Sequence, residues 1–361
     1  GADGEGRRRV RIACISYYLP PVDLIGSGMQ MHGLANAYVR HGHQVTMFSP
    51  YAKGADDALY QLCPVPVGNS NRVIRFAWNL RKQDFSQFDL LHAAMDDYLL
   101  LGKRRPFHIR TFHGSCLAEA MHIRGTRNRL RMLFLGLTEW LSCSVAHRRV
   151  CVSANTRRYI PFAREVIPNG VDLQIFRPGE DKSEHPSILF VGTMGYRKRG
   201  QMLLDIFERE ILPRVPDAEL WIAREPAPVN EKGVSWFGPV PLTELVRLYQ
   251  RAWVFCLPSS YEGFGVPYIE AMACGTPVVA TPNAGACEVL DGGRYGVLTE
   301  PEKLGQALLE VLRDADRRND LAARGLVRAQ EFGWDRIVAA YLEPVVRQRS
   351  VSTTCSGQEP K

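Results

Sequence analysis

Short apolar runs alternate with longer amphipathic stretches along the 361-residue chain. The first run, residues 9–17, is almost continuously apolar, as is typical of a parallel strand covered on both faces. After Ser27, apolar residues recur at the spacing of one helical face, and Gly42 follows where a C-terminal cap is expected. This alternation is typical of an α/β domain with a parallel sheet. The same pattern predicts further strands at residues 45–48, 90–92, 109–112 and 149–152.

A second set of strands and helices follows a turn-rich segment at residues 168–178. Helices then continue to about Val346, and the polar tail from Gln348 is predicted to be disordered. A chain of this length suggests two domains, each large enough for its own core. The predicted strands of the second half are 187–191, 219–223, 252–257, 278–280 and 296–298, and its clearest helices are 202–210 and 242–251.

The cysteines and the apolar segments argue against a zinc-binding, membrane-spanning or secreted protein. Nine cysteines, several of them inside apolar strands, are expected to be reduced core thiols, and no zinc-type spacing occurs. The sequence shows no spanning helix and no apolar core of a signal peptide. We therefore expect a cytoplasmic location.

Positive charge is concentrated in the first half of the chain. Residues 1–175 hold 23 basic and 13 acidic side chains, a net charge of +10, whereas the remainder has a net charge of −3. The densest segment carries arginines before a run of large apolar residues; these are Arg124, Arg127, Arg129, Arg131, Met132, Leu133, Phe134 and Leu135. A surface helix with a solvated basic face is the favoured interpretation, and peripheral contact with an anionic membrane is the alternative. Nucleic acid is not expected, because no basic–aromatic recognition module is present.

Two glutamates eight residues apart carry the most specific chemistry. Glu262 follows the apolar strand 252–257, and Glu270 lies on a helix that Pro267 begins. The turn between them, Gly263-Phe264-Gly265, brings backbone N–H groups and a helix N-terminus to a strand end, where a phosphate fits. Carboxylates beside an anion site are best explained as acceptors for hydroxyls of a sugar nucleotide. We expect Glu262 to bind the hexose and Glu270 the ribose, whereas the alternative is an exposed pair at a helix start.

This segment resembles the donor-site block of retaining glycosyltransferases of family 4, which have the two-domain GT-B fold. Other blocks resemble the family in the same order, and together they cover most of residues 8–345. They are GSGMQMHGLANAYVRHGHQV from Gly26, FDLLHA from Phe88, TFHG from Thr111, VCVSANTRRYI from Val150, VIPNGVDLQIFRP from Val166, ILFVGTMGYRKRG from Ile188 and GGRYGVL from Gly292.

The resemblance implies an α/β, GT-B architecture, with two Rossmann-like doubly wound parallel-sheet domains facing across a cleft that holds the active site. Residues 1–175 would form the acceptor domain and residues 176–335 the nucleotide-sugar donor domain. Residues 336–361 would form a helix that crosses back to the N-terminal domain, followed by the disordered tail.

The resemblance also implies roles for residues of the second half. Lys198 aligns with the lysine that the family places on the diphosphate, and the backbone from Gly263 to Val266 would line the donor site. Most relatives have arginine where this chain has Thr193, so a bidentate phosphate contact is missing there. Arg197 or Arg199 is the expected substitute.

In the first half, Gly26 and Gly28 would let the backbone approach the diphosphate at the start of the helix after Ser27. His113 matches a family histidine near the donor hexose and the acceptor, where it could donate a hydrogen bond or carry a proton. His92 has a weaker claim to such a role. The apolar loop at residues 18–25 would border the acceptor.

The expected reaction is a front-face transfer that uses no metal and no cofactor beyond the nucleotide-sugar co-substrate. Asp96-Asp97 and Asp314-Ala-Asp316 are poor metal candidates because they lie in a loop and in a charged helical stretch. Uridine is the predicted donor base, with guanosine and adenosine as alternatives; the acceptor is a small molecule, a lipid-linked sugar or a glycan. Two other functions remain open: a GT-B sugar-nucleotide 2-epimerase, and an inactive binding subunit, which Thr193 favours.

Overall fold

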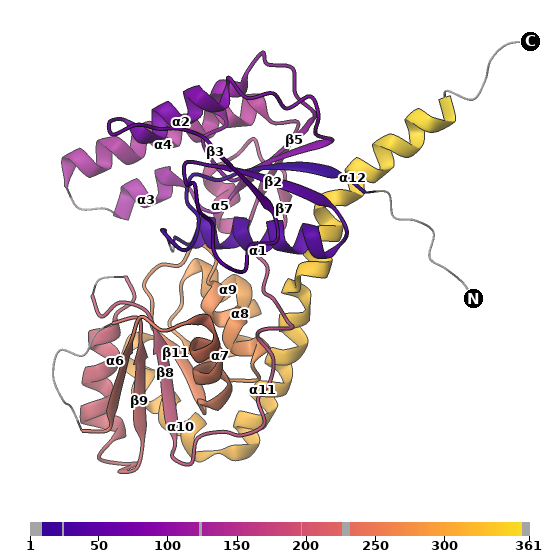
Figure 1. The fold of residues 1–361 in the computed structure, drawn as a ribbon. Coiled ribbons are helices and arrows are strands. Elements are labelled where there is room, and N and C mark those ends of the chain that lie inside the picture. The colour runs from indigo at the N-terminus through magenta and orange to yellow at the C-terminus, as the bar shows by residue number, and fades with distance from the viewer. Residues whose placement is uncertain (1–8, 24, 123–124, 196, 226–231, 356–361) are drawn as a thin grey trace, which may run out of the picture. The chain divides into compact units, whose positions relative to one another are not determined.

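The computed structural model describes residues 9–23, 25–122, 125–195, 197–225 and 232–355 (Figure 1). The chain forms two compact units: Gly1–Gly170 together with Trp334–Lys361, and Val171–Gly333. Each unit contains one parallel sheet flanked by helices. Within the described ranges, no helix has both the length and the apolar character needed to cross a membrane.

The first unit has a seven-stranded parallel sheet in the order β3-β2-β1-β4-β5-β6-β7. The strands expected near residues 9–17, 45–48, 90–92, 109–112 and 149–152 are confirmed. Two short strands at the edges of the sheet were not predicted, because their side chains are largely exposed or too few to form a pattern. The strands are β1 (Arg11–Ile15), β2 (Gln44–Ser49), β3 (Gln61–Pro64), β4 (Leu90–Ala93), β5 (Phe107–Phe112), β6 (Arg148–Cys151) and β7 (Glu165–Val166).

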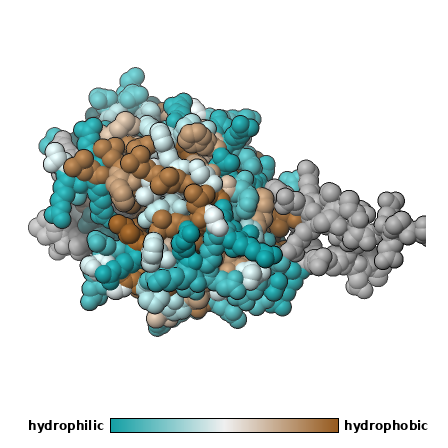
Figure 2. Space-filling view, turned by 90° about the horizontal axis from the view of Figure 1, so that it is seen from above, coloured by the Kyte–Doolittle hydropathy of each residue, from teal (hydrophilic) through white to brown (hydrophobic). Residues whose placement is uncertain are grey.

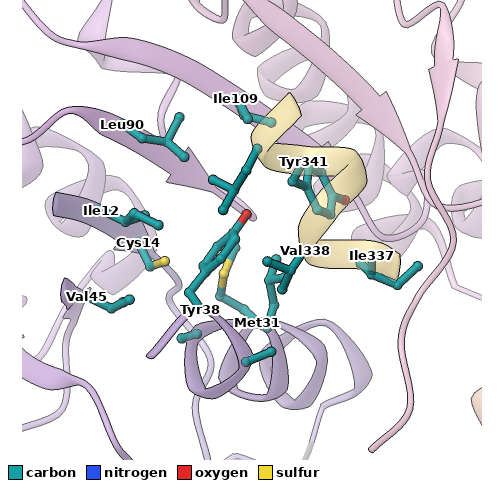
Figure 3. Packing of buried hydrophobic residues seen from close by; sticks show 14 of the residues in the cluster. Ile12, Cys14, Met31, Tyr38, Val45, Leu90, Ile109, Ile337, Val338 and Tyr341 are labelled. Carbon is teal, nitrogen blue, oxygen red and sulfur yellow. The ribbon is translucent and has the colours of Figure 1, made fainter. Parts of the chain in front are cut away.

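The main core of the first unit lies between the sheet and two helices that are far apart in the sequence. Figure 3 shows Met31 and Tyr38 of α1 facing Val338 and Tyr341 of α12. The C-terminal helix is therefore an integral part of this core. The helices of the unit are α1 (Gly26–Arg40), α2 (Arg72–Leu80), α3 (Cys116–His122), α4 (Thr126–Val145), α5 (Ala154–Tyr159) and α12 (Trp334–Cys355), with a 3-10 turn at Tyr98–Leu100.

The expected disorder from Gln348 onward is wrong as far as Cys355, because α12 continues to that residue. The packed part of α12 starts the helix, and no glycine or proline interrupts residues 345–355. Residues 356–361 lie outside the described residues.

Trp334 begins α12 at the point where the chain returns to the first unit. A Cβ added to Gly33 or Gly170 would lie 2.7 or 2.4 Å from the indole ring, so both glycines leave room for it. The second unit closes on itself beside this point: Val171 N–H donates to the Phe332 carbonyl at 2.8 Å, and Val171 forms a parallel bridge with Gly333.

The second unit has a six-stranded parallel sheet in the order β10-β9-β8-β11-β12-β13. The strands are β8 (Ser187–Val191), β9 (Glu219–Ala223), β10 (Val234–Gly238), β11 (Val254–Leu257), β12 (Val278–Ala280) and β13 (Val297–Leu298). All but β10, a partly exposed edge strand, were predicted. In both sheets the strand order reverses at the first strand, so ligand sites are expected at the carboxyl ends of β1 and β4, and of β8 and β11.

Helices flank this second sheet. The predicted helix at 242–251 is confirmed as α7 (Leu242–Arg251), and the helix at 202–210 is α6 (Gly200–Ile206) followed by a π-helical turn at Phe207–Ile211. The others are α8 (Val266–Ala273), α9 (Ala284–Val289), α10 (Leu304–Arg313) and α11 (Ala315–Ala329), with 3-10 turns at Asp291–Gly293, Pro301–Lys303 and Gln330–Phe332.

Candidate functional site

The carboxyl ends of β8 and β11 bring Lys198 and Glu262 together. Lys198 follows β8, Glu262 follows β11, and these two strands are neighbours in the sheet. The Lys198 Nζ donates to Glu262 Oε1 at 2.6 Å, and Glu262 is only 6% exposed. The sequence predicted a separate ligand contact for each residue. The structure shows that they form a direct, nearly buried ion pair.

Residues at the carboxyl end of β12 form hydrogen bonds with the loop that carries Glu262. Ser259 Oγ also donates to Glu262 Oε1 at 2.6 Å. The Ser259 carbonyl accepts from Thr281 Oγ1 at 2.9 Å and from Asn283 Nδ2 at 3.1 Å, and both of these residues follow β12. Asn283 also caps α9 through the N–H of Ala286. These supporting residues were missed, although polar residues directly after the predicted strand 278–280 could have indicated them.

The turn between the two glutamates requires glycine. Gly265 has a φ of 99°, in the left-handed region, and a Cβ there would lie 2.4 Å from the Tyr268 ring. Phe264 is buried and its ring meets the edge of Phe332 at a centroid distance of 5.9 Å. The Phe264 side chain therefore belongs to the core of the unit, so only its backbone is left for a ligand. Gly263 and Val266 are partly exposed on either side of this turn.

Glu270 lies on α8 and is held by a tyrosine from α7. Tyr249 OH donates to Glu270 Oε2 at 2.9 Å. Burial raises the pKa of the Glu270 carboxyl, and this effect is opposed by the positive charge of Arg224, the Tyr249 hydrogen bond and the charge of Lys198. Glu270 thus belongs to the same electrostatic cluster as Lys198.

Arg224 is the cation of this cluster that the sequence did not indicate. It follows β9 directly, is exposed, and has a φ of 78°, a left-handed conformation that is uncommon for a residue with a Cβ. Its N–H donates to the Gly238 carbonyl at 2.7 Å. A positive-φ position cannot be recognised in a sequence when a residue other than glycine occupies it.

The loop after β8 places the other predicted donor residues. Thr193 and Arg197 are exposed, and Arg199 has a φ of 53° at the N-cap of α6. The Arg197 carbonyl accepts from the Ser260 N–H at 2.8 Å, and its guanidinium lies 5.9 Å from the Tyr261 ring centroid. Arg197 is therefore linked to the loop that carries Glu262.

In the first unit, Gly26 and Gly28 lie in the first turn of α1, after the carboxyl end of β1. A Cβ on Gly28 would lie 2.5 Å from the Tyr18 carbonyl oxygen, whereas a Cβ on Gly26 would meet nothing within 4 Å. Gly28 is thus needed for packing of α1 against the preceding loop. Gly26 is the glycine whose surroundings leave space for a ligand.

His113 follows β5 and has one ring nitrogen without a hydrogen-bond partner among the described residues. Nδ1 lies 3.0 Å from Asn169 Oδ1, whereas the buried Nε2 has no partner there. Burial and the charge of Arg110 lower the pKa of His113 to about 4, and the Asn169 hydrogen bond opposes this. The ring is therefore neutral at pH 7. With Asn169 Oδ1 as the facing atom, the proton is assigned to Nδ1, and Nε2 can accept a hydrogen bond or a proton.

His92 has a structural role. Nδ1 lies 2.9 Å from Tyr38 OH and Nε2 lies 2.8 Å from Thr111 Oγ1, which in turn lies 3.0 Å from Tyr341 OH. This buried network ties α1, β4, β5 and α12 together. Since both ring nitrogens are engaged, His92 has no free position for a substrate.

One residue of each acidic pair, Asp97 and Asp314, has a structural role. The buried Asp97 carboxylate lies 2.9 Å from His108 Nε2 and 3.0 Å from Arg110 Nη1. Asp314 caps α11 by accepting from the Arg317 N–H at 2.9 Å. Across the described ranges, no three His, Cys, Asp or Glu side chains gather in a way that could hold a metal ion.

Two family models match the two halves of the chain. "Glycosyltransferase Family 4" matches residues 25–175, and "Glycosyl transferases group 1" matches residues 185–314. A D-inositol 3-phosphate glycosyltransferase from Corynebacterium jeikeium is 32% identical over 205 residues, which are 48% of this chain and 49% of the relative. The chain thus spans about half the length of this curated relative.

Solved structures of the GT-B fold match nearly the whole chain. Sucrose-phosphate synthase from Thermosynechococcus elongatus has a TM-score of 0.76 at 21% identity, covering 95% of this chain and 100% of that one. Anabaena Alr3699/HepE in complex with UDP-glucose has a TM-score of 0.72 at 16% identity, covering 95% and 100%. The fold predicted from the sequence is confirmed, and the chain belongs to the family 4 type of glycosyltransferases.

Proposed function

We propose that this protein is a retaining glycosyltransferase that moves a hexose-type sugar from a nucleotide sugar to an acceptor hydroxyl. The observation that carries the proposal is the Lys198–Glu262 pair at the ends of β8 and β11, with Glu270 on the helix that follows. Lys198 and the two glutamates lie at the carboxyl ends of parallel strands, where such sheets bind ligands. A nucleotide sugar needs a cation for its phosphates and carboxylates for its hydroxyls.

Lys198 binds the diphosphate in this proposal. When the diphosphate enters, its oxygens compete with Glu262 for the Lys198 ammonium group, and Glu262 becomes available to accept hydroxyl protons of the hexose. Glu270 accepts hydrogen bonds from the ribose. Arg197 and Arg224 add positive charge near the place where Thr193 replaces the usual arginine.

The chemical step needs no covalent enzyme intermediate. The bond between the anomeric carbon and the leaving phosphate oxygen breaks, and a bond from that carbon to the acceptor oxygen forms on the same face. The acceptor proton passes to the departing phosphate. Lys198, the arginines and the N-terminus of α8 stabilise the charge that develops on the diphosphate, so the reaction is proposed to proceed without a metal.

Uridine diphosphate is the first nucleotide to test, because the similarly folded Anabaena Alr3699/HepE was crystallised with UDP-glucose. Calorimetric titration without added metal, with UDP, GDP and ADP in parallel, would identify the donor base. Binding of one nucleotide at micromolar concentration is expected, and no binding of any of the three would contradict the proposal.

Product analysis then tests the type of reaction. The matching nucleotide sugar should be consumed only when an acceptor is present, and the new glycosidic bond should keep the anomeric configuration of the donor, as read from the coupling of the anomeric proton. Conversion of the sugar nucleotide to its 2-epimer without acceptor would show the epimerase instead. Nucleotide binding without turnover for any acceptor class would indicate an inactive binding subunit.

A further inference from the structure

Helix α4 in the first unit exposes its large apolar side chains. They are Leu130, Leu133, Phe134, Leu137, Trp140 and Leu141, each between 40% and 67% exposed. Their spacing of three and four residues places them on one face of the helix, across an arc of about 120° at 100° per residue. We call these six residues the α4 apolar stripe.

The opposite face of α4 is the one that packs against the protein. Its buried residues are Gly136, Thr138, Ser142, Cys143 and Val145, Met132 and Leu135 are half-buried, and a Cβ on Gly136 would lie 2.5 Å from the Leu117 side chain. A surface helix of a globular domain normally has the reverse arrangement. The favoured sequence interpretation, a solvated basic face, therefore does not account for α4, because leucine, phenylalanine and tryptophan occupy the face that is turned to solvent.

The surroundings of the stripe extend the apolar surface. Phe162, after α5, is 53% exposed, and its ring meets the edge of Trp140 at a centroid distance of 6.1 Å. The Trp140 indole N–H donates to the Tyr159 carbonyl at 3.2 Å, which fixes the ring in its exposed position. Helices α2 and α4 lie at the top of Figure 1, and Figure 2, seen from above, shows hydrophobic side chains gathered on this face.

Positive charge borders the stripe on both sides. Arg127, Arg129 and Arg131 are exposed; helical spacing places Arg127 and Arg131 along one side and Arg129 along the other. The only acidic residue of α4, Glu139, accepts from the Cys116 N–H at 3.0 and 3.2 Å, so its carboxylate is occupied within the protein. Arg124 lies outside the described residues.

We propose that the α4 apolar stripe docks the protein on the surface of a membrane that contains anionic lipids. An apolar helical face flanked by arginines suits a helix lying in the plane of the interface, with the guanidinium groups at the level of the phosphates and Trp140 at the polar boundary. A second copy of the chain fits less well, because a two-fold contact of stripe on stripe would bring arginines toward arginines.

Co-sedimentation with vesicles tests the proposal. The parent protein should bind vesicles of phosphatidylcholine and phosphatidylglycerol, bind phosphatidylcholine alone more weakly, and lose affinity as salt is added. Phe134→Glu/Leu137→Glu should reduce partitioning at least about tenfold. Arg129→Gln/Arg131→Gln should reduce binding to the anionic vesicles by about fivefold for each charge removed.

The matched control is Val327→Glu on α11, another exposed apolar residue, which is 65% exposed and lies in the second unit. This variant should bind vesicles like the parent. UDP affinity and the thermal unfolding midpoint should be unchanged in all variants, since the substituted side chains are exposed and distant in sequence from the proposed donor residues.

Two results would overturn the proposal. One is failure of the parent to bind the anionic vesicles, or equal binding by the Phe134→Glu/Leu137→Glu variant and the Val327→Glu control. The other is a dimer, seen by light scattering, that the double variant dissociates while vesicles capture neither protein; the stripe would then be a contact between copies. Neither result bears on donor binding, so the test is independent of the proposed function.

Discussion

Lys198 and Glu262, separated by 64 positions in the chain, form a 2.6 Å ion pair in which one oxygen also accepts from Ser259. Lys198, proposed to bind the diphosphate, and Glu262, proposed to bind the sugar, are therefore bonded to each other before substrate arrives. The substrate must compete with this internal ion pair. This competition can be measured by removing either partner.

Glu262→Ala should leave UDP affinity equal to that of the parent or higher, because Lys198 no longer has an internal partner. Sugar transfer should fall by about 100-fold, as expected for the loss of one preorganised polar contact in the reaction. Lys198→Ala should instead weaken UDP binding by about 1–3 kcal/mol, the value of a charged hydrogen bond. Calorimetry and initial rates give both quantities, and equal loss of UDP affinity in the two variants would contradict this division of roles.

The Tyr249–Glu270 hydrogen bond predicts a pH dependence of nucleotide binding. Because burial raises the pKa of Glu270, the carboxyl binds a proton as the pH falls through that raised pKa, before an ordinary glutamate does. A protonated Glu270 is a poorer acceptor for a ribose hydroxyl, so UDP affinity should fall on acidification. Tyr249→Phe removes one of the effects that lower this pKa, and the loss should then begin at a higher pH.

Titrations of UDP binding between neutral and mildly acidic pH would show this shift. Glu270→Ala is the control: it should bind UDP about 1–3 kcal/mol more weakly and lose this pH dependence. A pH profile of Tyr249→Phe that coincides with that of the parent would rule out the coupling.

His113 and His92 should respond differently to substitution. His113→Ala should lower turnover while UDP affinity stays near that of the parent, and it should cost less stability than His92→Ala, because only the bond to Asn169 is lost and Nε2 has no hydrogen-bond partner among the described residues. His92→Ala should lower the free energy of unfolding by about 1–3 kcal/mol, because the Tyr38 and Thr111 hydroxyls lose their buried partner. Urea unfolding and initial rates distinguish the two. Since the pKa of His113 is about 4, its charge should not change the rate between pH 6 and 8.

Arg224 offers a test in which stability and binding move in opposite directions. Arg224→Gly removes the Cβ from a residue with a φ of 78°, a conformation that costs about 1–2 kcal/mol for a residue other than glycine. The variant should therefore unfold at an equal or higher temperature, yet bind UDP more weakly by on the order of 1 kcal/mol through loss of the charge. Arg224→Ala is the matched variant and should show the weaker binding without the gain in stability. If both variants bind UDP like the parent, Arg224 does not substitute for the arginine missing at Thr193.

The parts of the fold that the sequence predicted are those with buried, nearly continuous apolar strands, such as β1, β8 and β11. Strands β3 and β10 were missed because partial exposure at a sheet edge removes the apolar pattern. Glu262, Glu270 and Lys198 could be selected from the sequence because turn glycines and strand ends mark them. The ion pair between Lys198 and Glu262 could not be predicted, because it depends on β8 and β11 being neighbours in the sheet although α6, β9, β10 and α7 separate them in the chain.

For helix α4, the sequence did not predict which face is exposed. Periodicity gives the spacing of Leu130, Leu133 and Leu137 but does not say which side of the helix the protein covers. Only packing against Leu117 at Gly136 settles that side.

Trp334 has a consequence for the chain as a whole. It rests against Gly170, the last residue before the second unit, and Val171 is joined to Gly333 at the other side of the same junction. The second unit is thus an inserted domain: it lies in the sequence between residues 170 and 334 of the first unit, and its own first and last residues are in contact. Such a segment can be exchanged as a whole: the second unit of a relative, joined at positions 171 and 333, would need no linker, and α12 would still complete the core of the first unit.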